Sequence, residues 1–271
     1  MILQMNLIQA IILGLVQGIA EFLPISSSGH LVLLQHVFRL EIENAYLLTF
    51  DIVVHLGSLV AILIVFWPDI WALIKNPFQK MVGLLIIGTI PAVIVGLMFQ
   101  DFIVNYLRSG LWLAVAFTVT GIILLIADRL PSGTKEKNDI TWLDALFVGI
   151  AQAFAIPPGI SRSGTTIAAA LGRGINRQAA AKFSFLLAII AIAGAGVLDT
   201  YELVLGDGAA IYAVGMGNMI VGFIVSAVVG YFSIRLLLKL IHACKLRYFS
   251  YYVWVLAALI FVDYLIVNRF F

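Results

Sequence analysis

Charged residues are scarce in this sequence. Only 11% of its 271 residues are Asp, Glu, Lys or Arg, whereas about 25% is usual for a soluble globular domain. Hydrophobic residues make up 63% of the chain, and the mean hydropathy is +1.10. A soluble helix is apolar on one face only, so apolar runs along the whole length exclude a mainly soluble fold. Most of the chain is expected to face lipid.

Cysteine and polar stretches are also nearly absent. Cys244 is the only cysteine, which excludes an internal disulfide and a metal site built from several thiolates. The N-terminus has no basic region and no small-residue cleavage site, so we expect no removable signal peptide. The longest polar stretch, Asp128 to Asp139, has only the length of a linker. Residues 1–271 are therefore predicted to form a single membrane domain.

The apolar runs fall into two kinds. Six are long enough to cross about 30 Å of hydrocarbon as helices. Two others, at 6–38 and 142–173, are interrupted by Pro, Gly and Ser at 24–29 and 157–164, so each predicts a helix-loop-helix unit that enters the membrane and returns. The fold class is thus an all-α polytopic membrane protein with six transmembrane helices and two re-entrant units. The six spans are expected near 47–67, 82–99, 111–127, 183–198, 211–234 and 249–267.

The two halves of the sequence resemble each other. An offset of 135 aligns Gly14 to His30 with Gly149 to Thr165, and seven of the seventeen positions are identical. We predict a duplicated unit, with repeat 1 at about 1–134 and repeat 2 at about 135–271. Each repeat holds one re-entrant unit and three crossings. Since three is odd, the halves should have inverted topology.

The positions of the basic residues predict the orientation. In this topology one side carries twelve of the sixteen Lys and Arg residues, and the other side carries only Arg39, Arg108 and Arg269. The basic side is cytoplasmic by the positive-inside rule. Both termini and the mouth of the first re-entrant unit are then expected outside the plasma membrane. The twelve are Lys75, Lys80, Arg129, Lys135, Lys137, Arg173, Arg177, Lys182, Arg235, Lys239, Lys245 and Arg247.

Polar side chains concentrate in the two interrupted regions. Gln17 and Glu21 are four residues apart and share one helix face. Arg162 lies among hydroxyls in the second region, ahead of an expected helix start. An Arg, several hydroxyls and backbone amides suit a phosphate. The Glu21 carboxylate fits beside a phosphate if a divalent metal bridges them, with Gln17 as a neutral oxygen ligand.

Several roles stay open at this point. Ser27 and His30 are both candidates to attack phosphorus, and His30 is also suited to exchange protons near neutral pH. Glu21 and Arg162 either form a structural ion pair or act on a ligand, and the membrane position favours the second. Asp51 and His55 are either a structural pair or part of the same cavity. Hydroxyls that instead bond back to a carbonyl of their own helix would be structural, and this alternative applies to Ser26, Ser28, Ser163 and Thr165.

Two motifs carry a family resemblance. Residues 17–30, QGIAEFLPISSSGH, and 158–164, PGISRSG, closely resemble the undecaprenyl-diphosphatase family, UppP or BacA. The resemblance also covers Gly174 to Leu187 and extends over essentially the whole chain. Gln17 takes the less acidic option of the family's Glu/Gln-x-x-x-Glu motif.

The resemblance implies an activity and a set of site residues. It implies removal of the terminal phosphate from undecaprenyl diphosphate, which yields the monophosphate carrier lipid of cell-wall synthesis and raises bacitracin tolerance. It implies a divalent cation, Mg²⁺ or Ca²⁺, held by Gln17 and Glu21, and a site that opens to the outer face. Arg162 would bind phosphate and Ser27 or His30 would be the nucleophile. The hydroxyls expected around the diphosphate are those of Ser26, Ser28, Ser161, Ser163 and Thr166.

Two other classes of protein compete with this interpretation. Inverted repeats with paired broken helices are also typical of secondary transporters, so the alternative is a transporter or flippase of a lipid phosphate. Transport of an anion does not need Glu21 and His30 beside Arg162, whereas hydrolysis does. Membrane phosphatases related to acid phosphatases need a second His after the Ser-Arg pair, and this chain has none there. The expected partners are the polyprenyl diphosphate and membrane lipid, with no nucleic acid; a homodimer is left open.

Overall fold

The computed structural model describes residues 5–40, 42, 44–205, 214–240 and 245–271. Cys244 and the first residues of the span expected at 211–234 lie outside the described residues. The described residues are nearly all helical and contain no strand, apart from one isolated bridge between Lys135 and Ile175. The prediction of an all-α protein is confirmed.

The helices follow a similar order in both halves of the described chain, although only the first half has a described short helix between its long ones. The first half contains α1 (Leu7–Ala20), α2 (Ser27–Val37), α3 (Asn44–Val65), α4 (Trp67–Lys75), α5 (Lys80–Tyr106) and α6 (Gly110–Arg129). The second half contains η1 (Lys137–Asp139), α7 (Trp142–Phe154), α8 (Arg162–Gly172), α9 (Arg177–Leu205), α11 (Met216–Leu240), α12 (Arg247–Val262) and η2 (Asp263–Val267). In each half, two short helices precede the long ones.

Six of the described helices are long and apolar enough to cross a membrane, namely α3, α5, α6, α9, α11 and α12 with η2. This number agrees with the six predicted spans, and the chain is a multi-pass membrane protein. The first span ends at Val65 rather than near residue 67, and the short helix α4 begins directly after it. Pro68 lies in the first turn of α4, where its missing N–H cannot continue the hydrogen bonding of α3. The sequence reasoning missed this separate helix.

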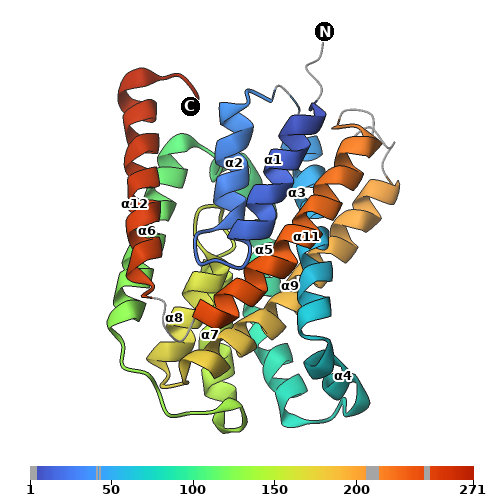
Figure 1. Ribbon diagram of the computed structural model, residues 1–271, viewed down its shortest axis with the longest axis vertical. Helices are drawn as coiled ribbons and strands as arrows, with labels where there is room; N and C mark the ends of the chain where they lie inside the picture. Colours follow the sequence, from blue (N-terminus) through green and yellow to red (C-terminus); the bar gives the residue numbers. More distant parts are fainter. Residues whose placement is uncertain (1–4, 41, 43, 206–213, 241–244) are drawn as a thin grey trace.

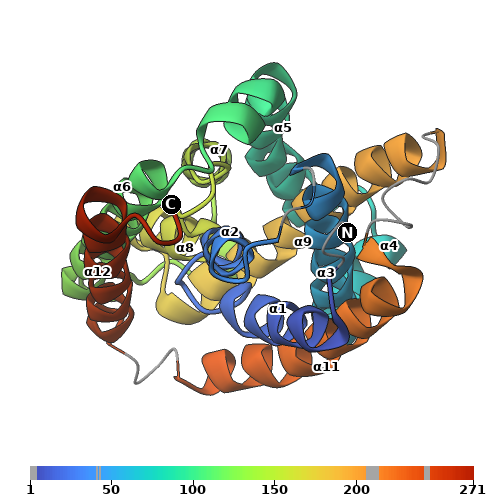
Figure 2. The ribbon, with the colours of Figure 1, turned by 90° about the horizontal axis from the view of Figure 1, so that it is seen from above.

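The two short pairs break where the sequence predicts. The chain leaves the helix between α1 and α2 at residues 21–26, and between α7 and α8 at 155–161. In Figure 1 the α1–α2 pair occupies the upper part of the bundle and the α7–α8 pair the lower part. Figure 2 shows α2 and α8 near the centre, with the long helices around them. The duplication and the entry of the pairs from opposite membrane faces stay predictions.

Close packing places α1 against α11. A Cβ atom on Gly14 would lie 2.8 Å from the carbonyl oxygen of Gly222, and one on Gly18 would lie 2.8 Å from that of Ser226. Only glycine allows two helix backbones to approach this closely, which is the usual way in which helices associate in membranes. The end of α1, where the first break begins, is thereby fixed against the bundle.

A buried carboxylate fixes the other pair. Asp144, in the first turn of α7, accepts hydrogen bonds from Lys135 Nζ at 2.9 Å and from Arg173 Nε at 2.7 Å. Burial by itself would raise the pKa of Asp144, but these bonds and those from Thr141 hold it well below the usual range. The start of α7 is therefore tied to the residue that follows α8, and the hairpin is closed at this end.

Candidate active site

The two interrupted segments meet in the middle of the bundle. The backbone N–H of Gly159 donates to Ser26 Oγ at 3.1 Å, and Ser163 Oγ donates to the carbonyl oxygen of Leu23 at 3.2 Å. A Cβ atom on Gly29 would lie only 2.7 Å from the Cα of Gly159. The two segments thus touch backbone to backbone, although 133 residues separate Ser26 from Gly159.

Helix α6 supports the second segment. Thr120 Oγ1 donates to the carbonyl oxygen of Gly159 at 2.8 Å and accepts from the backbone N–H of Ser161 at 3.1 Å. Trp112 Nε1 donates to the carbonyl oxygen of Pro158 at 2.9 Å. Non-helical backbone at membrane depth needs such partners because lipid supplies none.

Two residues adopt unusual backbone angles to make these turns. Gly159 has φ +94° and Ser26 has φ +70°. Glycine adopts a positive φ readily, but a serine does so at a cost of roughly 1–3 kcal/mol. Ser26 is the N-cap of α2, and its hydroxyl accepts from the backbone N–H of Gly29 as well as from Gly159. These two hydrogen bonds offset the strain.

Glu21 lies at the centre of the cluster. Its Oε1 accepts from Arg162 Nη2 at 2.5 Å, so two residues that are 141 positions apart in the sequence are in direct contact. Its Oε2 accepts from Ser27 Oγ at 2.5 Å and from Gln17 Nε2 at 3.0 Å. The ring of His55 approaches the same oxygen, with Nε2 at 3.4 Å. One buried carboxylate therefore joins both segments and α3.

His30 has different neighbours. Its Nδ1 lies 2.7 Å from the carbonyl oxygen of Ser26, and its Nε2 lies 2.8 Å from the hydroxyl of Tyr252 on α12. Of the two predicted nucleophiles, Ser27 is therefore the one that contacts Glu21. His30 is one helical turn further along α2.

Most of the hydroxyls predicted to bind phosphate hold the backbone in this structure. Ser161 Oγ accepts from the backbone N–H of Gly164 at 3.1 Å, as an N-cap does. Thr166 Oγ1 donates to the carbonyl oxygen of Arg162 at 2.8 Å and contacts Ser184 Oγ at 2.5 Å.

The hydroxyls of Ser26 and Ser163 join the two segments, as described above. Ser28 is the least buried of the five, and its Oγ lies 3.4 Å from Ser26 Oγ. Phosphate binding by this set of five stays a prediction.

Two polar atoms of the cluster are left without a partner. Arg162 Nη1 and Gln17 Oε1 are buried and make no hydrogen bond within the described part of the chain. One is a cationic donor, which suits a phosphate oxygen, and the other is a neutral oxygen, which suits Mg²⁺ or Ca²⁺. The described residues contain no group of three or more His, Cys, Asp or Glu side chains that could hold a metal by itself. Gln17 and Glu21 would fit a cation that is also bound by phosphate oxygens.

Sequence reasoning left His55 undecided and missed a network next to it. Asp51 Oδ1 accepts from Gln35 Nε2 at 2.7 Å, and Arg108 Nη2 donates to Gln35 Oε1 at 2.7 Å. Asp51 thus belongs to a structural network, whereas His55, one turn later on α3, reaches Glu21. Asp51 and His55 are four residues apart, a spacing that indicates a shared polar face on one helix. Nothing in the sequence linked Tyr252 to His30, because 222 residues separate them.

Comparison with known proteins places the chain in a family. The sequence model of the family described as Bacitracin resistance protein BacA matches residues 10–259. The chain belongs to the BacA family. The match includes both interrupted segments, and so it includes every residue that contacts Glu21.

Curated relatives in the BacA family cover nearly the whole chain. A protein of Carboxydothermus hydrogenoformans named undecaprenyl-diphosphatase is 51% identical over 258 residues, which are 95% of this chain and 97% of the relative. Undecaprenyl-diphosphatase 3 of Bacillus cereus is 44% identical over 94% of this chain and 96% of its own length. The undecaprenyl-diphosphatase of Thermodesulfovibrio yellowstonii is 44% identical over 97% of this chain and 99% of its own length.

The turn at Gly159 and its close packing against α6 predict the effect of adding a single methyl group. Gly159→Ala should lower the unfolding free energy by roughly 1–3 kcal/mol, because its φ of +94° disfavours any side chain and the new Cβ would lie 2.6 Å from Ala116 Cβ. Thermal unfolding in detergent measures the change. Gly172→Ala is the matched control, since no atom lies within 4 Å of its new Cβ. Equal unfolding temperatures for the two variants would contradict the prediction.

Proposed function

We propose that this chain is an integral-membrane phosphatase that hydrolyses undecaprenyl diphosphate to undecaprenyl phosphate and inorganic phosphate. One observation carries the proposal: a single carboxylate, that of Glu21, contacts both the Ser27 hydroxyl and the Arg162 guanidinium. This combines an activated nucleophile with a phosphate-binding cation, the two elements that hydrolysis of an anhydride requires. The names of the relatives point to the same substrate.

Ser27 is the nucleophile in this proposal. Its Oγ attacks the terminal phosphorus as Glu21 Oε2, at 2.5 Å, accepts the hydroxyl proton. The bond between this phosphorus and the bridging oxygen breaks, and undecaprenyl phosphate leaves. His30 then accepts a proton at Nε2 from a water molecule that attacks the phosphoserine. The bond between Ser27 Oγ and phosphorus breaks, phosphate is released, and Ser27 recovers its proton from Glu21. His30 gives up its proton to solvent before the next turnover.

Arg162 stabilises the charge on the phosphoryl oxygens. Its Nη2 is already bound to Glu21, which leaves the unpartnered Nη1 for the substrate. A guanidinium that is fixed in advance costs no reorganisation during the reaction. Gln17 and Glu21 would hold Mg²⁺ or Ca²⁺ together with phosphate oxygens, and the bound cation would neutralise further negative charge.

The proposed orientation follows the distribution of the basic residues. The start of α1 and the C-terminus lie at the same end of the bundle in Figure 1. We place this end and the mouth of the site at the outer face of the plasma membrane, because it is the side with few Lys and Arg residues. Hydrolysis there would regenerate the carrier lipid for cell-wall synthesis and lower the amount of diphosphate available to bacitracin.

The transporter alternative has no support among the relatives named above, each of which is named as a phosphatase. A homodimer, which the sequence left open, is not required for the chemistry. Glu21, Ser27 and Arg162 all come from one chain.

The role of Arg162 predicts a large loss of turnover. Arg162→Ala should reduce phosphate release from undecaprenyl diphosphate by about 10²-fold or more, as for other electrostatic stabilisers of a transition state. Arg162→Lys should recover only part of the rate, because an ammonium group cannot bind two oxygens side by side. The assay uses purified protein in detergent. Arg235→Ala, at an exposed arginine that contacts Tyr231, is the control and should keep its activity. Near-normal hydrolysis by folded Arg162→Ala protein would contradict the proposal.

The role of Glu21 predicts a changed metal requirement. Glu21→Gln should raise the concentration of Mg²⁺ or Ca²⁺ that gives half of the maximal rate, because the cation loses its charged ligand. The enzyme is first stripped with a chelator, and phosphate release is then followed as the cation is added back. Asp101→Asn, at an exposed carboxylate, is the matched control. An unchanged requirement in the Glu21 variant would remove Glu21 from the metal site.

The orientation predicts which side exposes the C-terminus. A tag placed after Phe271 should react with a membrane-impermeant reagent in intact cells, because the basic loops hold the opposite side in the cytoplasm. Labelling that appears only after the cells are permeabilised would reverse the proposed topology.

A further inference from the structure

We propose that Tyr252 is a positioning residue for His30, and that its hydroxyl and its ring preset the orientation of the imidazole for turnover. The proposal rests on the proposed function, in which His30 Nε2 accepts a proton from water. Tyr252 comes from α12, in the other half of the chain, and the residue is 47% exposed. It is therefore not a core residue that helix packing alone would place.

The hydrogen bonds of His30 assign its protons. The partner of Nδ1, at 2.7 Å, is the carbonyl oxygen of Ser26, which can only accept. Nδ1 therefore carries the proton, and Nε2 of the neutral ring is a hydrogen-bond acceptor. The hydroxyl of Tyr252, at 2.8 Å from Nε2, then acts as the donor. The carbonyl of Ser26 therefore sets the tautomer, and the Tyr252 hydroxyl holds in place the nitrogen that the reaction needs as a base.

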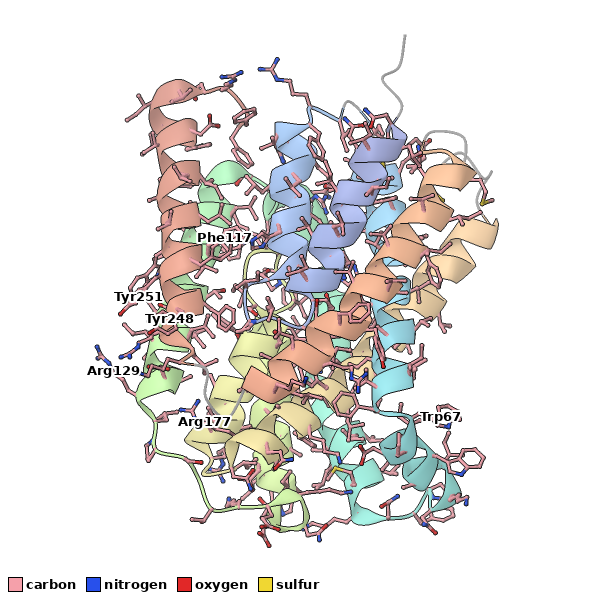
Figure 3. All side chains as sticks on the ribbon, in the orientation of Figure 1. Trp67, Phe117, Arg129, Arg177, Tyr248 and Tyr251 are labelled. Carbon is pink, nitrogen blue, oxygen red and sulfur yellow. The ribbon has the colours of Figure 1, made fainter. Side chains whose placement is uncertain are left out.

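Ring contacts fix the plane of the imidazole. The rings of His30 and Tyr252 are stacked, with centroids 5.7 Å apart and planes inclined by only 7°. Phe117 contacts the imidazole edge-to-face, with ring centroids 5.2 Å apart and planes inclined by 81°, and Figure 3 shows Phe117 on the inner side of α6. His30 is thus held by two hydrogen bonds and two rings, so a water molecule that replaces the hydroxyl meets a ring already in place.

A structural role alone would also explain part of this arrangement. Tyrosines near the ends of membrane helices commonly anchor the helix at the interface, and Tyr248 and Tyr251 occur on the same helix. An anchor acts through its ring and its exposure, however, and would not depend on His30. This difference defines the experiment.

The central variant is Tyr252→Phe, which removes the hydroxyl and keeps the stacked ring. It should lower kcat for phosphate release on the order of 10-fold, the value of one hydrogen bond, and leave KM unchanged. Tyr251→Phe is the matched control. The centroid of the Tyr251 ring lies 6.3 Å from that of Trp254, and the side chain points away from the bundle in Figure 3. Tyr251→Phe should leave both constants unchanged.

A double-mutant cycle tests whether Tyr252 acts through His30. In a His30→Gln background, Tyr252→Phe should cause no further loss of kcat, because the interaction has already been removed. Equal losses in both backgrounds would assign Tyr252 a merely structural role and overturn the proposal.

Side-chain nitrogen NMR of histidine-labelled protein gives a readout that is independent of activity. The chain has only four histidines, so His30→Gln assigns the His30 signals. Tyr252→Phe should shift the Nε2 signal of His30, and Tyr251→Phe should not. An unchanged Nε2 signal, or a shifted signal with wild-type kcat, would overturn the positioning role. Wild-type protein that releases no phosphate would instead refute the proposed function, and the positioning role with it.

Discussion

Backbone in the middle of an apolar bundle must find its hydrogen-bond partners within the protein. The two interrupted segments meet this requirement partly by bonding to each other, and α6 supplies further partners to the second segment. The amide of Gly159 donates to Ser26, and Ser163 donates to the carbonyl of Leu23. Because these bonds hold the segments together, the side chains at their tips have nearly fixed positions. The arrangement of the candidate site is a consequence of this backbone requirement.

Charged side chains at this depth also need partners within the protein. An isolated carboxylate or guanidinium is costly at membrane depth, and Glu21 and Arg162 compensate each other across the junction of the segments. The pair does not use all the bonding capacity of the cluster. Arg162 Nη1 and Gln17 Oε1 remain unpartnered among the described residues. An ion pair with a spare donor and a spare acceptor nearby is suited to binding as well as to stability.

Each half of the chain supports the interrupted segment of the other. Thr120, on α6 of the first half, holds the backbone of Gly159 and Ser161 in the second segment. Tyr252, on α12 of the second half, holds the ring of His30 in the first segment. Helices α6 and α12 also pack against each other. The outer helices therefore act as a joint support, and neither segment is complete without residues from the opposite half.

Local chemistry was enough to predict the spans, the two breaks and the polar residues at their tips, because hydropathy and the backbone limits of Pro and Gly are properties of short stretches. The charges expected at membrane depth also indicated that Glu21 and Arg162 either pair with each other or act on a ligand. Only the tertiary structure decided that His55 reaches Glu21, that Tyr252 reaches His30, and that Ser26, Ser161, Ser163 and Thr166 bond to the backbone or to neighbouring hydroxyls. These contacts depend on how helices distant in sequence pack and rotate against one another, which no local pattern encodes.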